Sequence, residues 1–371
     1  MVEPGDMQTV AAFTDTYLPT VNGVTYTVRT WRDCWERHNG LMGVVYPDDD
    51  GYESGVREFP VSSVPFPFYP GFRFGLPDVP AGVRGLEPDL VHAHTPFSLG
   101  LAARRFALDR DLPLVVSYHT PAREYTGYIS DAFAGVISRV ADRYERWFFE
   151  QADAVIVPSA TAADRVATDG TPTHVVSNGV DIERFEPADE AAVAAFRERH
   201  DLPEGPLVGY TGRHGYEKRL EDLLAATASL NVGVVLGGDG PARPELQRRA
   251  AARDDVRFLG FLDRTELPTF YSALDAFAFP SPVETQGLVA LEATACGTPV
   301  AAVDSGALSE SVIDGETGYH FQPGDVDGFR AAVRRVLEER PTLSARCLES
   351  RPELSVERSM ERLSSVYDGL C

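Results

Sequence analysis

The chain has 371 residues, of which 43% are hydrophobic, and 56 acidic side chains outnumber 34 basic ones to give a formal charge of −22. This length exceeds what one compact core usually supports, so two domains are expected. The charge argues against nucleic acid as a partner, and against attraction to an anionic membrane through net charge. Lys218 is the single lysine. Such a composition is typical of proteins that work at high salt, where repulsion is screened; an acidic, GC-rich proteome is the alternative explanation.

No apolar run approaches the ~20 residues of a membrane span. The first seven residues carry neither the basic nor the apolar segment of a signal peptide. The cysteines, which are Cys34, Cys296, Cys347 and Cys371, show no metal-ligand or redox spacing. We therefore expect a cytoplasmic protein with free thiols.

The N-terminal half alternates between apolar runs and helical patterns. Strands are predicted at 9–14, 41–46, 56–61, 114–117, 154–158 and 173–176, with another at 89–96 that runs into a loop, and helices at 24–38, 97–108 and 132–151. Asn22 and Gly23 stand at the start of the first helix, where the backbone can approach a phosphate or sugar closely. A plain strand-to-helix turn is the alternative. The opening lacks G-x-G-x-x-G, so a dinucleotide is not indicated.

Three features of this half could meet a ligand, an acceptor or a membrane. His119 follows the strand at 114–117, and open α/β sheets bind ligands at the carboxyl ends of their strands; a structural histidine is the alternative. Residues 62–75 are expected to form a long loop that exposes aromatic side chains, among them Phe66, Phe68 and Tyr69. This loop either meets lipid or acceptor, or packs on its own domain. The helix at 132–151 is expected to be a core helix with a solvated face, the alternative being contact with a membrane.

The second half begins a similar alternating unit after a crossing at 177–185. Strands are predicted at 207–212, 232–236, 256–259, 276–279 and 300–303, a turn at 314–318, and helices at 220–229, 325–339 and 356–367. A short helix is expected between Gly287 and Gly297, with an apolar face formed by Leu288, Leu291 and Ala295.

Two carboxylates stand eight positions apart in the stretch 279–302. Glu284 lies in the loop before the short helix, and Glu292 lies in its second turn. Between them lie the backbone amides at the start of the helix, which have no partner within the helix and form a site for a phosphate. These amides belong to Gln286, Gly287, Leu288 and Val289. Gly287 has no side chain to keep a ligand from the backbone. Carboxylates for sugar hydroxyls and amides for phosphate are what a nucleotide sugar needs. The alternative is a helix with a stabilising acid near its start and a solvated glutamate.

This stretch resembles the E-x7-E signature of the retaining, GT-B-fold glycosyltransferases of family 4, including the Gly-Leu-Val after the first Glu and the Cys-Gly-Thr-Pro-Val tail. The resemblance implies that Glu284 contacts the transferred sugar and that Glu292 binds the ribose. It extends over nearly the whole chain. Arg213 and Lys218 match the basic pair on the donor pyrophosphate, and Gly238 lies in the glycine-rich loop. Residues 177–181 match the interdomain signature.

The N-terminal half is similar to the branch that glycosylates membrane lipids, such as diacylglycerol glucosyltransferases. The residues behind this similarity are 15–24, 92–100 and 118–120. The resemblance implies an acceptor site that includes Asn22, His119 and Tyr125. Members of that branch that dock on anionic membranes tend to carry a basic N-terminal face, and the acidity of this chain departs from that pattern.

The resemblance implies an α/β protein of GT-B fold, with two Rossmann-like domains facing a central cleft. Residues 1–180, with a C-terminal helix at about 356–371 that returns to them, are expected to bind the acceptor, and residues 181–355 the nucleotide sugar. The family precedent is front-face attack, in which the leaving phosphate accepts the proton of the acceptor. No metal or cofactor is expected.

The expected activity is retaining transfer of a hexose from a UDP- or GDP-sugar to a hydroxyl acceptor. The catalytic residues expected are His119, Arg213, Lys218 and Glu284; the donor-binding ones are Gly23, Gly238, Gln286, Gly287, Leu288, Val289 and Glu292. The acceptor expected is a membrane lipid, which would place the protein on the inner face of the cell membrane. A soluble or polyprenyl-linked saccharide is the alternative, and a non-catalytic two-lobed sugar-binding protein is a remote one.

Overall fold

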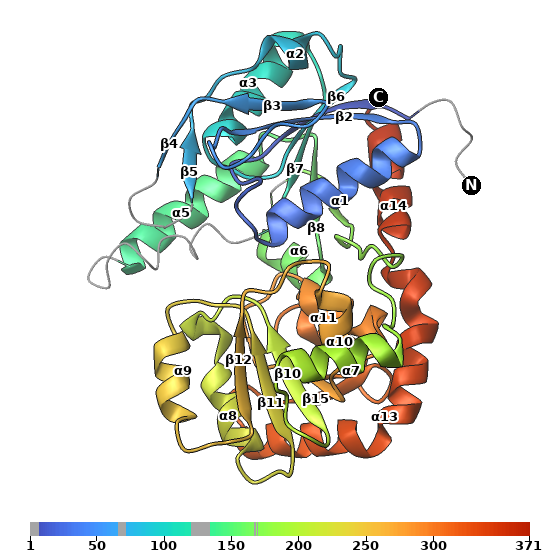
Figure 1. The fold of residues 1–371 in the computed structure, drawn as a ribbon. Helices are drawn as coiled ribbons and strands as arrows, with labels where there is room; N and C mark the ends of the chain where they lie inside the picture. The colour runs from blue at the N-terminus through green and yellow to red at the C-terminus, as the bar shows by residue number, and fades with distance from the viewer. Residues whose placement is uncertain (1–6, 66–71, 120–133, 167, 169) are drawn as a thin grey trace. The chain divides into compact units, whose positions relative to one another are not determined.

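The computed structural model describes residues 7–65, 72–119, 134–166, 168 and 170–371 (Figure 1). The chain divides into two compact units. Unit 1 comprises residues 1–178 and 356–371, and unit 2 comprises residues 179–355. Each described unit is built around a parallel sheet flanked by helices. None of the helices in the described ranges has the length and apolar character needed to cross a membrane.

Unit 1 begins with a strand–helix–strand segment and ends with the C-terminal helix of the chain. Its elements are β1 (Thr9–Phe13), α1 (Gly23–Arg37), β2 (Leu41–Pro47), β3 (Glu58–Val61), β4 (Ser63–Pro65), β5 (Arg73–Gly75), α2 (Ala81–Arg84), β6 (Leu90–Ala93), α3 (Ser98–Arg110), β7 (Leu114–Ser117), α5 (Ala134–Phe149), β8 (Ala154–Val157), α6 (Ala160–Val166), β9 (Thr173–Val175) and α14 (Val356–Asp368).

Unit 2 repeats the alternation. Its elements are α7 (Glu190–Arg199), β10 (Leu207–Thr211), the 3-10 turn η1 (Tyr216–Lys218), α8 (Leu220–Thr227), β11 (Gly233–Gly237), α9 (Arg243–Arg249), β12 (Val256–Gly260), α10 (Leu267–Ser272), β13 (Ala276–Phe279), α11 (Leu288–Ala295), β14 (Val300–Val303), α12 (Leu308–Ser311), β15 (Gly318–Phe321) and α13 (Val326–Leu354).

The seven-stranded sheet of unit 1 has the order β3-β2-β1-β6-β7-β8-β9, and every neighbouring pair is parallel. Alternate residues of β1 enter different cores. Ala11 and Phe13 pack in the core that contains side chains of α3 and α5, whereas Val10 and Ala12 pack in the core that contains side chains of α1 and α14. Both faces of the strand are buried, which explains its continuous apolar run.

Helix α14 packs against α1 within unit 1 (Figure 1). The ring centroids of Trp35 and Tyr367 lie 5.3 Å apart in an edge-to-face arrangement. Arg37 Nη2 and Glu357 Oε1 lie 3.2 Å apart at the surface of the same pair of helices. The C-terminal helix therefore returns to the N-terminal unit, as expected for the GT-B fold.

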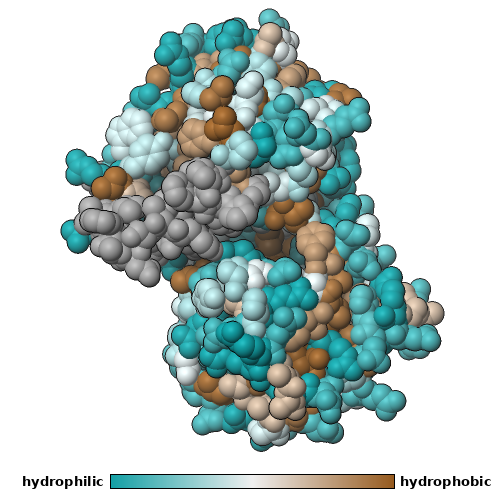
Figure 2. Space-filling model, turned by 60° about the vertical axis from the view of Figure 1, so that its left-hand side comes forward, coloured by the Kyte–Doolittle hydropathy of each residue, from teal (hydrophilic) through white to brown (hydrophobic). Residues whose placement is uncertain are grey.

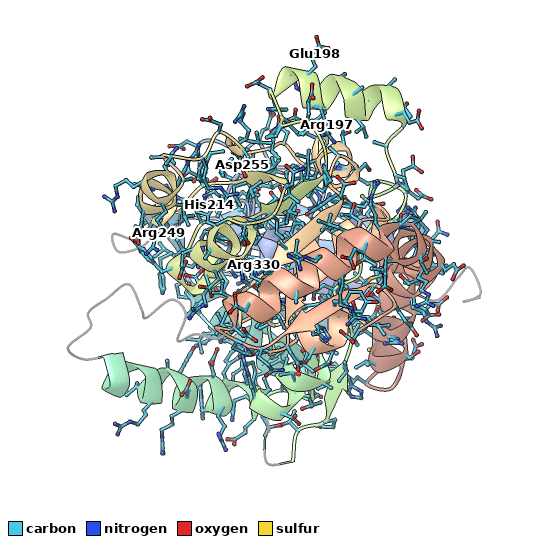
Figure 3. All side chains as sticks on the ribbon, turned by 90° about the horizontal axis from the view of Figure 1, so that it is seen from below. Arg197, Glu198, His214, Arg249, Asp255 and Arg330 are labelled. Atoms are coloured by element: carbon cyan, nitrogen blue, oxygen red, sulfur yellow. The ribbon has the colours of Figure 1, made fainter. Side chains whose placement is uncertain are left out.

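The six-stranded sheet of unit 2 has the order β12-β11-β10-β13-β14-β15 and is parallel throughout. Arg330 of α13 donates from Nε to the Ala226 carbonyl of α8 at 3.1 Å, which satisfies one carbonyl near the end of that helix. Figure 3 shows Arg330 on α13, and it shows Glu198 projecting outward from α7. The face of the molecule in Figure 2 is mainly hydrophilic, with hydrophobic residues scattered over it.

Two secondary-structure expectations were wrong. Residues 62–75 are not wholly a loop, because β4 and β5 pair antiparallel and Arg73 Nε donates to Ser63 Oγ at 2.7 Å. The helix expected at 325–339 continues to Leu354 as α13, with Pro341 inside it. A proline removes one helical hydrogen bond, but buried Leu343 and Cys347 anchor the next turns in the structure. The aromatic residues Phe66, Phe68 and Tyr69 lie outside the described residues.

Several short helices were not predicted. They are α2, α7, α9, α10 and α12. Helix α7 is the longest of them, and its single buried side chain is Phe196, so its sequence shows no apolar stripe. The sequence does contain a signal for its start, because aspartate is a preferred N-cap residue and Asp189 precedes the helix. In the structure, Asp189 Oδ1 accepts from Ala192 N at 2.7 Å.

Candidate active site

Both sheets have a topological switch point, where the chain order reverses. In unit 1 it lies between β1 and β6, and in unit 2 it lies between β10 and β13. Open α/β sheets bind ligands in the crevice outside the carboxyl ends of the two strands at such a point. The residues that follow these four strands are therefore the first candidates for a site in each unit.

In unit 2, a buried ion pair spans the switch point. Lys218, which ends η1 after β10, donates from Nζ to Glu284 Oε1, in the loop after β13, at 2.6 Å. The two side chains are only 16% and 14% exposed. Burial alone would lower the pKa of Lys218, but the Glu284 carboxylate raises it above its ordinary value. The structure thus joins two residues that stand 66 positions apart and that the sequence assigns to the same donor site.

Arg213 lies beside this pair, also after β10. Its Nη2 donates to Glu217 Oε1 at 2.6 Å. The charges of Lys218, Glu284, Glu217 and Arg213 all act on the buried Tyr210 hydroxyl, although burial is the main reason that the Tyr210 pKa is raised. Arg213, Lys218 and Glu284 therefore form one local charge cluster at the end of β10.

The glycine-rich loop after β11 lies against the loop after β10. Gly238 has a φ of +98°, and a Cβ there would lie 2.0 Å from the Gly212 carbonyl oxygen. Gly238 N also donates to the Gly260 carbonyl. Close backbone packing at the end of the sheet therefore requires glycine here, independently of any ligand. The loop that it shapes borders the cluster of Arg213 and Lys218.

Helix α11 begins at this site. Gly287 is its N-cap with a φ of +79°, and no side chain caps the helix. A Cβ at Gly287 would lie 2.6 Å from Leu308 Cδ2, and its positive φ is strained for other residues, so the fold favours glycine here independently of any ligand. The first amides, including those of Leu288 and Val289, have no acceptor within the helix. Gln286 is buried, and its carbonyl accepts from Ser311 Oγ at 2.7 Å.

Glu292 is buried rather than solvated, so the alternative reading of it as a surface residue is wrong. Its Oε2 accepts from Tyr271 Oη at 2.8 Å, and its Oε1 accepts from Arg264 Nη1 at 3.2 Å. Burial raises the pKa of Glu292, whereas Arg264 and Tyr271 act in the opposite direction. The expected apolar face of α11 is also wider than predicted, because Ala290 to Ala295 are all buried, Glu292 among them.

In unit 1, Asp15 spans the switch point. This fully buried side chain follows β1 and caps α3, which begins after β6: Oδ1 accepts from Ser98 Oγ at 2.7 Å and from Leu99 N at 3.0 Å. Its Oδ2 accepts from Thr95 Oγ1 at 2.6 Å. Burial raises the pKa of Asp15, and these hydrogen bonds oppose that rise. Asp15 therefore holds the loop after β6 in place.

Three imidazole rings stack beside this loop. His92 and His94 have centroids 4.1 Å apart, and His94 and His119 have centroids 5.4 Å apart with an interplanar angle of 15°. His94 Nδ1 lies 3.1 Å from His119 Nε2. Burial lowers the pKa of His92 to about 3 and that of His119 to about 4, and it lowers the pKa of His94 well below its ordinary value. All three rings are therefore neutral near pH 7.

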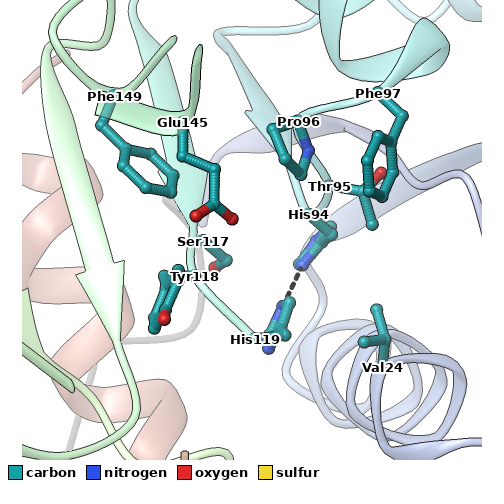
Figure 4. Close-up of a pocket in the computed structure, with 10 residues that line it drawn as sticks. All are labelled: Val24, His94, Thr95, Pro96, Phe97, Ser117, Tyr118, His119, Glu145 and Phe149. Atoms are coloured by element: carbon teal, nitrogen blue, oxygen red, sulfur yellow. Dashed lines mark hydrogen bonds between the residues drawn. The ribbon is translucent and has the colours of Figure 1, made fainter. Parts of the chain in front are cut away.

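His94 and His119 line a pocket at the carboxyl edge of the sheet in unit 1. The other lining residues are Val24, Thr95, Pro96, Phe97, Ser117, Tyr118, Glu145 and Phe149. Figure 4 shows the side chains of His94, His119 and Glu145 around it. His119, which follows β7, thus lies at the edge of this pocket.

The remaining acceptor candidates have structural roles or lie outside the description. Asn22 caps α1, with its Oδ1 accepting from Thr25 N at 2.9 Å and its Nδ2 donating to Thr16 Oγ1 at 2.7 Å. Gly23 is the first residue of α1. Tyr125 lies outside the described residues. Within unit 1, the structure therefore brings His119 together with His94 and Glu145, two residues that the sequence did not single out.

Sequence reasoning missed several polar residues of these sites. They are Asp15, His94 and Glu145 in unit 1, and Tyr271 and Arg264 in unit 2. One signal was available for Glu145, because it stands four positions before Phe149 and thus on the buried face of α5. Tyr271 and Arg264, the partners of Glu292, carry no comparable signal. They lie more than 20 positions before Glu292 and contact it only once the chain has folded.

Two family descriptions match the chain in sequence. Residues 193–351 match the glycosyl transferases group 1, and residues 21–184 match glycosyltransferase family 4. Similar proteins include a glycogen synthase of Mycobacterium tuberculosis, 32% identical over 88% of this chain and 83% of the relative. A GDP-mannose-dependent alpha-mannosyltransferase of Mycolicibacterium smegmatis is 32% identical over 89% of both chains. An alpha-monoglucosyldiacylglycerol synthase of Streptococcus pneumoniae is 28% identical over 96% of this chain and 85% of the relative.

Solved structures share the fold. A sucrose-phosphate synthase from Thermosynechococcus elongatus superposes with a TM-score of 0.78 at 22% identity, covering 98% of this chain and 99% of the other. The Anabaena protein HepE, in a complex with UDP-glucose, gives a TM-score of 0.73 at 20% identity over 97% and 100% of the two chains. Together with the identity and coverage of the sequence relatives, this fold shows that the chain is a glycosyltransferase that uses a nucleotide sugar and belongs to family 4 of the GT-B-fold enzymes.

Proposed function

We propose that this glycosyltransferase transfers a hexose from a UDP- or GDP-sugar with retention of anomeric configuration, and that its acceptor is the hydroxyl of a membrane lipid. The observation that carries the donor part is the Lys218–Glu284 pair at the switch point of unit 2. It joins a cation for phosphate and a carboxylate for sugar hydroxyls, beside the uncapped start of α11.

The charges of this site suit a diphosphate leaving group. Negative charge grows on the leaving phosphate as the bond to the sugar breaks, and preorganised positive groups stabilise it. Lys218, Arg213 and the first amides of α11 supply this stabilisation in our proposal. Because a lysine ammonium has three donors, Lys218 can bind a phosphate oxygen while it keeps its hydrogen bond to Glu284. We propose that no metal ion is needed for this step.

Glu284 and Glu292 take different parts in the proposed reaction. Glu284 accepts from hydroxyls of the transferred sugar, while Glu292 accepts from the ribose. Each oxygen of Glu292 already has a protein donor in the ligand-free chain, one from Tyr271 and one from Arg264. A carboxylate oxygen can accept a second hydrogen bond, so ribose can bind without displacing these partners. They would hold the carboxylate in a fixed orientation.

The acceptor is proposed to be a lipid, which would place the protein on the inner face of the cell membrane. The sequence similarity of the N-terminal half to lipid glycosyltransferases supports this, as does a relative described as an alpha-monoglucosyldiacylglycerol synthase. A soluble or polyprenyl-linked saccharide is the alternative, favoured by the relatives described as a glycogen synthase and an alpha-mannosyltransferase.

The test is incubation of the full chain with radiolabelled UDP- and GDP-sugars, first with diacylglycerol vesicles and then with soluble saccharides, at molar salt and with or without EDTA. Label in the lipid phase, unchanged by EDTA, is expected. Transfer to soluble saccharide alone would favour the alternative acceptor, and loss of transfer with EDTA would contradict the metal-free step.

A further inference from the structure

We propose that the outward face of α5, together with the neighbouring face of α3, docks unit 1 on an anionic lipid surface. This inference rests on the proposed function, in which the acceptor is a membrane lipid, and it names the surface through which the protein reaches that lipid. It starts from the burial pattern of α5. Glu145, Phe148 and Phe149 of this helix are buried, whereas Val140 and Trp147 are 64% and 41% exposed.

The outward face of α5 also carries three arginines. Arg139, Arg143 and Arg146 are exposed, and none of them forms an ion pair with an acidic side chain in the part of the chain that the structure describes. Two exposed acids, Asp142 on the helix and Glu150 directly after it, lie nearby without pairing with these arginines. Three guanidinium groups without acidic partners, in a chain whose formal charge is −22, indicate contact with an anionic partner.

Helical periodicity separates the apolar side chains from the arginines. Val140 and Trp147 stand seven positions apart, which is nearly two turns, so they lie on one side of the outward face. Arg139 and Arg146 are related in the same way on the other side, and Arg143 lies between the two pairs. An apolar and aromatic stripe beside an arginine stripe is the pattern of helices that lie at a membrane surface, where the ring enters the headgroup region and the arginines stay at the lipid phosphates.

Helix α3 extends this face. The Arg104 guanidinium carbon lies 5.6 Å from the centroid of the Trp147 ring, and Arg104 Nη2 donates to Gln151 Oε1 at 2.9 Å, directly after α5. Leu101 and Leu108 stand three positions before Arg104 and four positions after it, so they lie on the same side of α3. Both leucines are exposed. Together with the exposed apolar and arginine side chains of α5 named above, they form what we call the α3–α5 surface.

The helix that carries this surface also lines the pocket of unit 1. Glu145 and Phe149, on the inner face of α5, are two of the lining residues (Figure 4). Tyr144 connects the two regions. Its ring centroid lies 5.8 Å from that of Trp147, and its hydroxyl donates to the carbonyl of Pro96, another lining residue. A lipid surface docked at Trp147 would therefore lie one aromatic side chain away from the pocket.

The acidity of the whole chain does not oppose this contact at high salt. The screening length is ~3 Å at molar salt, so acids elsewhere on the protein do not act on the membrane, whereas partly buried pairs between arginine and lipid phosphate are screened less. A second copy of the chain fits the α3–α5 surface less well. A two-fold dimer through this surface would place the arginines of one copy against the same arginines of the other.

The test is flotation of the full chain with vesicles of phosphatidylcholine, alone or mixed with phosphatidylglycerol, in the absence of donor sugar. The arginine variant combines Arg139→Gln, Arg143→Gln and Arg146→Gln. The control makes the same change in net charge at exposed arginines of α9, α13 and α14, and it combines Arg248→Gln, Arg334→Gln and Arg362→Gln. At the lowest salt that keeps the chain folded, we expect the arginine variant to bind the mixed vesicles roughly 10-fold more weakly, with the control unchanged. At molar salt this difference should narrow.

Trp147→Ser tests the apolar part of the surface. We expect it to weaken vesicle binding roughly 10-fold at low and at molar salt, because burial of apolar area is not screened. Trp147→Phe keeps a ring and should retain most of the binding at equal thermal stability. Unchanged flotation of the arginine variant and Trp147→Ser, or equal weakening in the control, would overturn the proposal. A dimer detected by light scattering and dissociated by Trp147→Ser, without flotation of the wild type, would overturn it in favour of a second copy.

Transfer to diacylglycerol dispersed in detergent, measured beside flotation, distinguishes failure of this proposal from failure of the proposed function. Transfer without flotation of the wild type would refute the docking surface and leave the lipid acceptor in place. Flotation that the α5 variants weaken, with transfer to soluble saccharides alone, would support the docking surface and refute the lipid acceptor.

Discussion

The single lysine of the chain, Lys218, donates its Nζ hydrogen to Glu284 Oε1 over 2.6 Å, across the switch point of the second sheet. Elsewhere every side chain with a permanent positive charge is an arginine. The site that keeps the lysine is buried and already contains the side chain of Arg213. An ammonium is a compact point charge, whereas a guanidinium is a wide planar fork, so we propose that this site accommodates a lysine better than an arginine.

Lys218→Ala should reduce turnover by roughly 10²–10³-fold, the scale for removal of one preorganised charge stabiliser. It also leaves the Glu284 carboxylate without the Lys218 ammonium at a side-chain exposure of only 14%. Lys218→Arg should recover part of the rate, because the charge returns but the fork does not fit the same space. Steady-state rates with saturating donor measure both. Wild-type turnover in Lys218→Arg would refute the steric argument, and wild-type turnover in Lys218→Ala would remove the phosphate role.

The two glutamates should separate in kinetics. Glu284→Ala should lower turnover, because this carboxylate contacts the transferred sugar in the proposed reaction. Glu292→Ala should mainly weaken donor binding, through loss of charge-assisted hydrogen bonds of ~1.5–3 kcal/mol. Tyr271→Phe is the matched control, since it removes one donor to Glu292 and keeps the carboxylate. Calorimetric titration of UDP and GDP, beside turnover, checks this. Unchanged donor affinity and full activity in both glutamate variants would exclude the assignment.

Asp15 should matter for stability. Asp15→Ala leaves Ser98, Thr95 and the Leu99 amide without their buried acceptor, which should cost about 3 kcal/mol of the free energy of unfolding. Asp15→Asn keeps one oxygen acceptor and should cost less. The three tryptophans, Trp31, Trp35 and Trp147, all lie in unit 1, so denaturation followed by tryptophan fluorescence reports this unit. Equal stability of Asp15→Ala and wild type would show that the cap contributes nothing.

The histidine stack predicts how stability depends on pH. The pKa of His119 is lowered to about 4 in the folded chain, against ~6.5 for a free histidine. Between these values the unfolded chain binds more protons than the folded one, so the free energy of unfolding rises with pH. Below pH ~6.5 we expect a loss of up to ~1.4 kcal/mol per pH unit from this residue.

The measurement is tryptophan-monitored denaturation of unit 1 from pH 4 to 7 at constant salt. His119→Gln should flatten the pH dependence, since glutamine does not titrate. His92 and His94, whose pKa values are also lowered, should maintain part of the slope in that variant. A slope identical to that of the wild type would show that His119 is protonated equally well in the folded and unfolded states.

Much of the fold could be predicted from the sequence because parallel strands buried on both faces leave continuous apolar runs. The strands at 114–117, 276–279 and 300–303 have the predicted bounds. The pairing of β4 with β5 was not predicted, because strands of only three residues are too short to show a periodic pattern in the sequence. The extension of α13 beyond Pro341 depends on the burial of Leu343 and Cys347, a tertiary effect that local rules on proline do not contain.

The sequence indicated many of the residues of the candidate site, but it did not indicate which of them contact one another. The family resemblance assigned Glu284 and Lys218 to one donor site, yet their hydrogen bond depends on two loops that meet only when β10 pairs with β13. Asp15 lies in the stretch 15–24 that resembles the lipid-glycosylating branch, but its cap on α3 joins residues more than 80 positions apart. Likewise, the contact between His94 and His119 results from the pairing of β6 with β7.

The anomeric configuration of the product tests the central claim most directly. The full chain would be incubated with 13C-labelled UDP-glucose or GDP-mannose and diacylglycerol vesicles at molar salt, and the one-bond C–H coupling at the anomeric carbon of the lipid product would be measured by NMR. The account predicts an α-linked glycolipid from these α-linked donors, formed by the wild type and strongly reduced in Lys218→Ala. A β-linked product would contradict the retaining mechanism, and glycosylation of soluble saccharides alone would contradict the lipid acceptor.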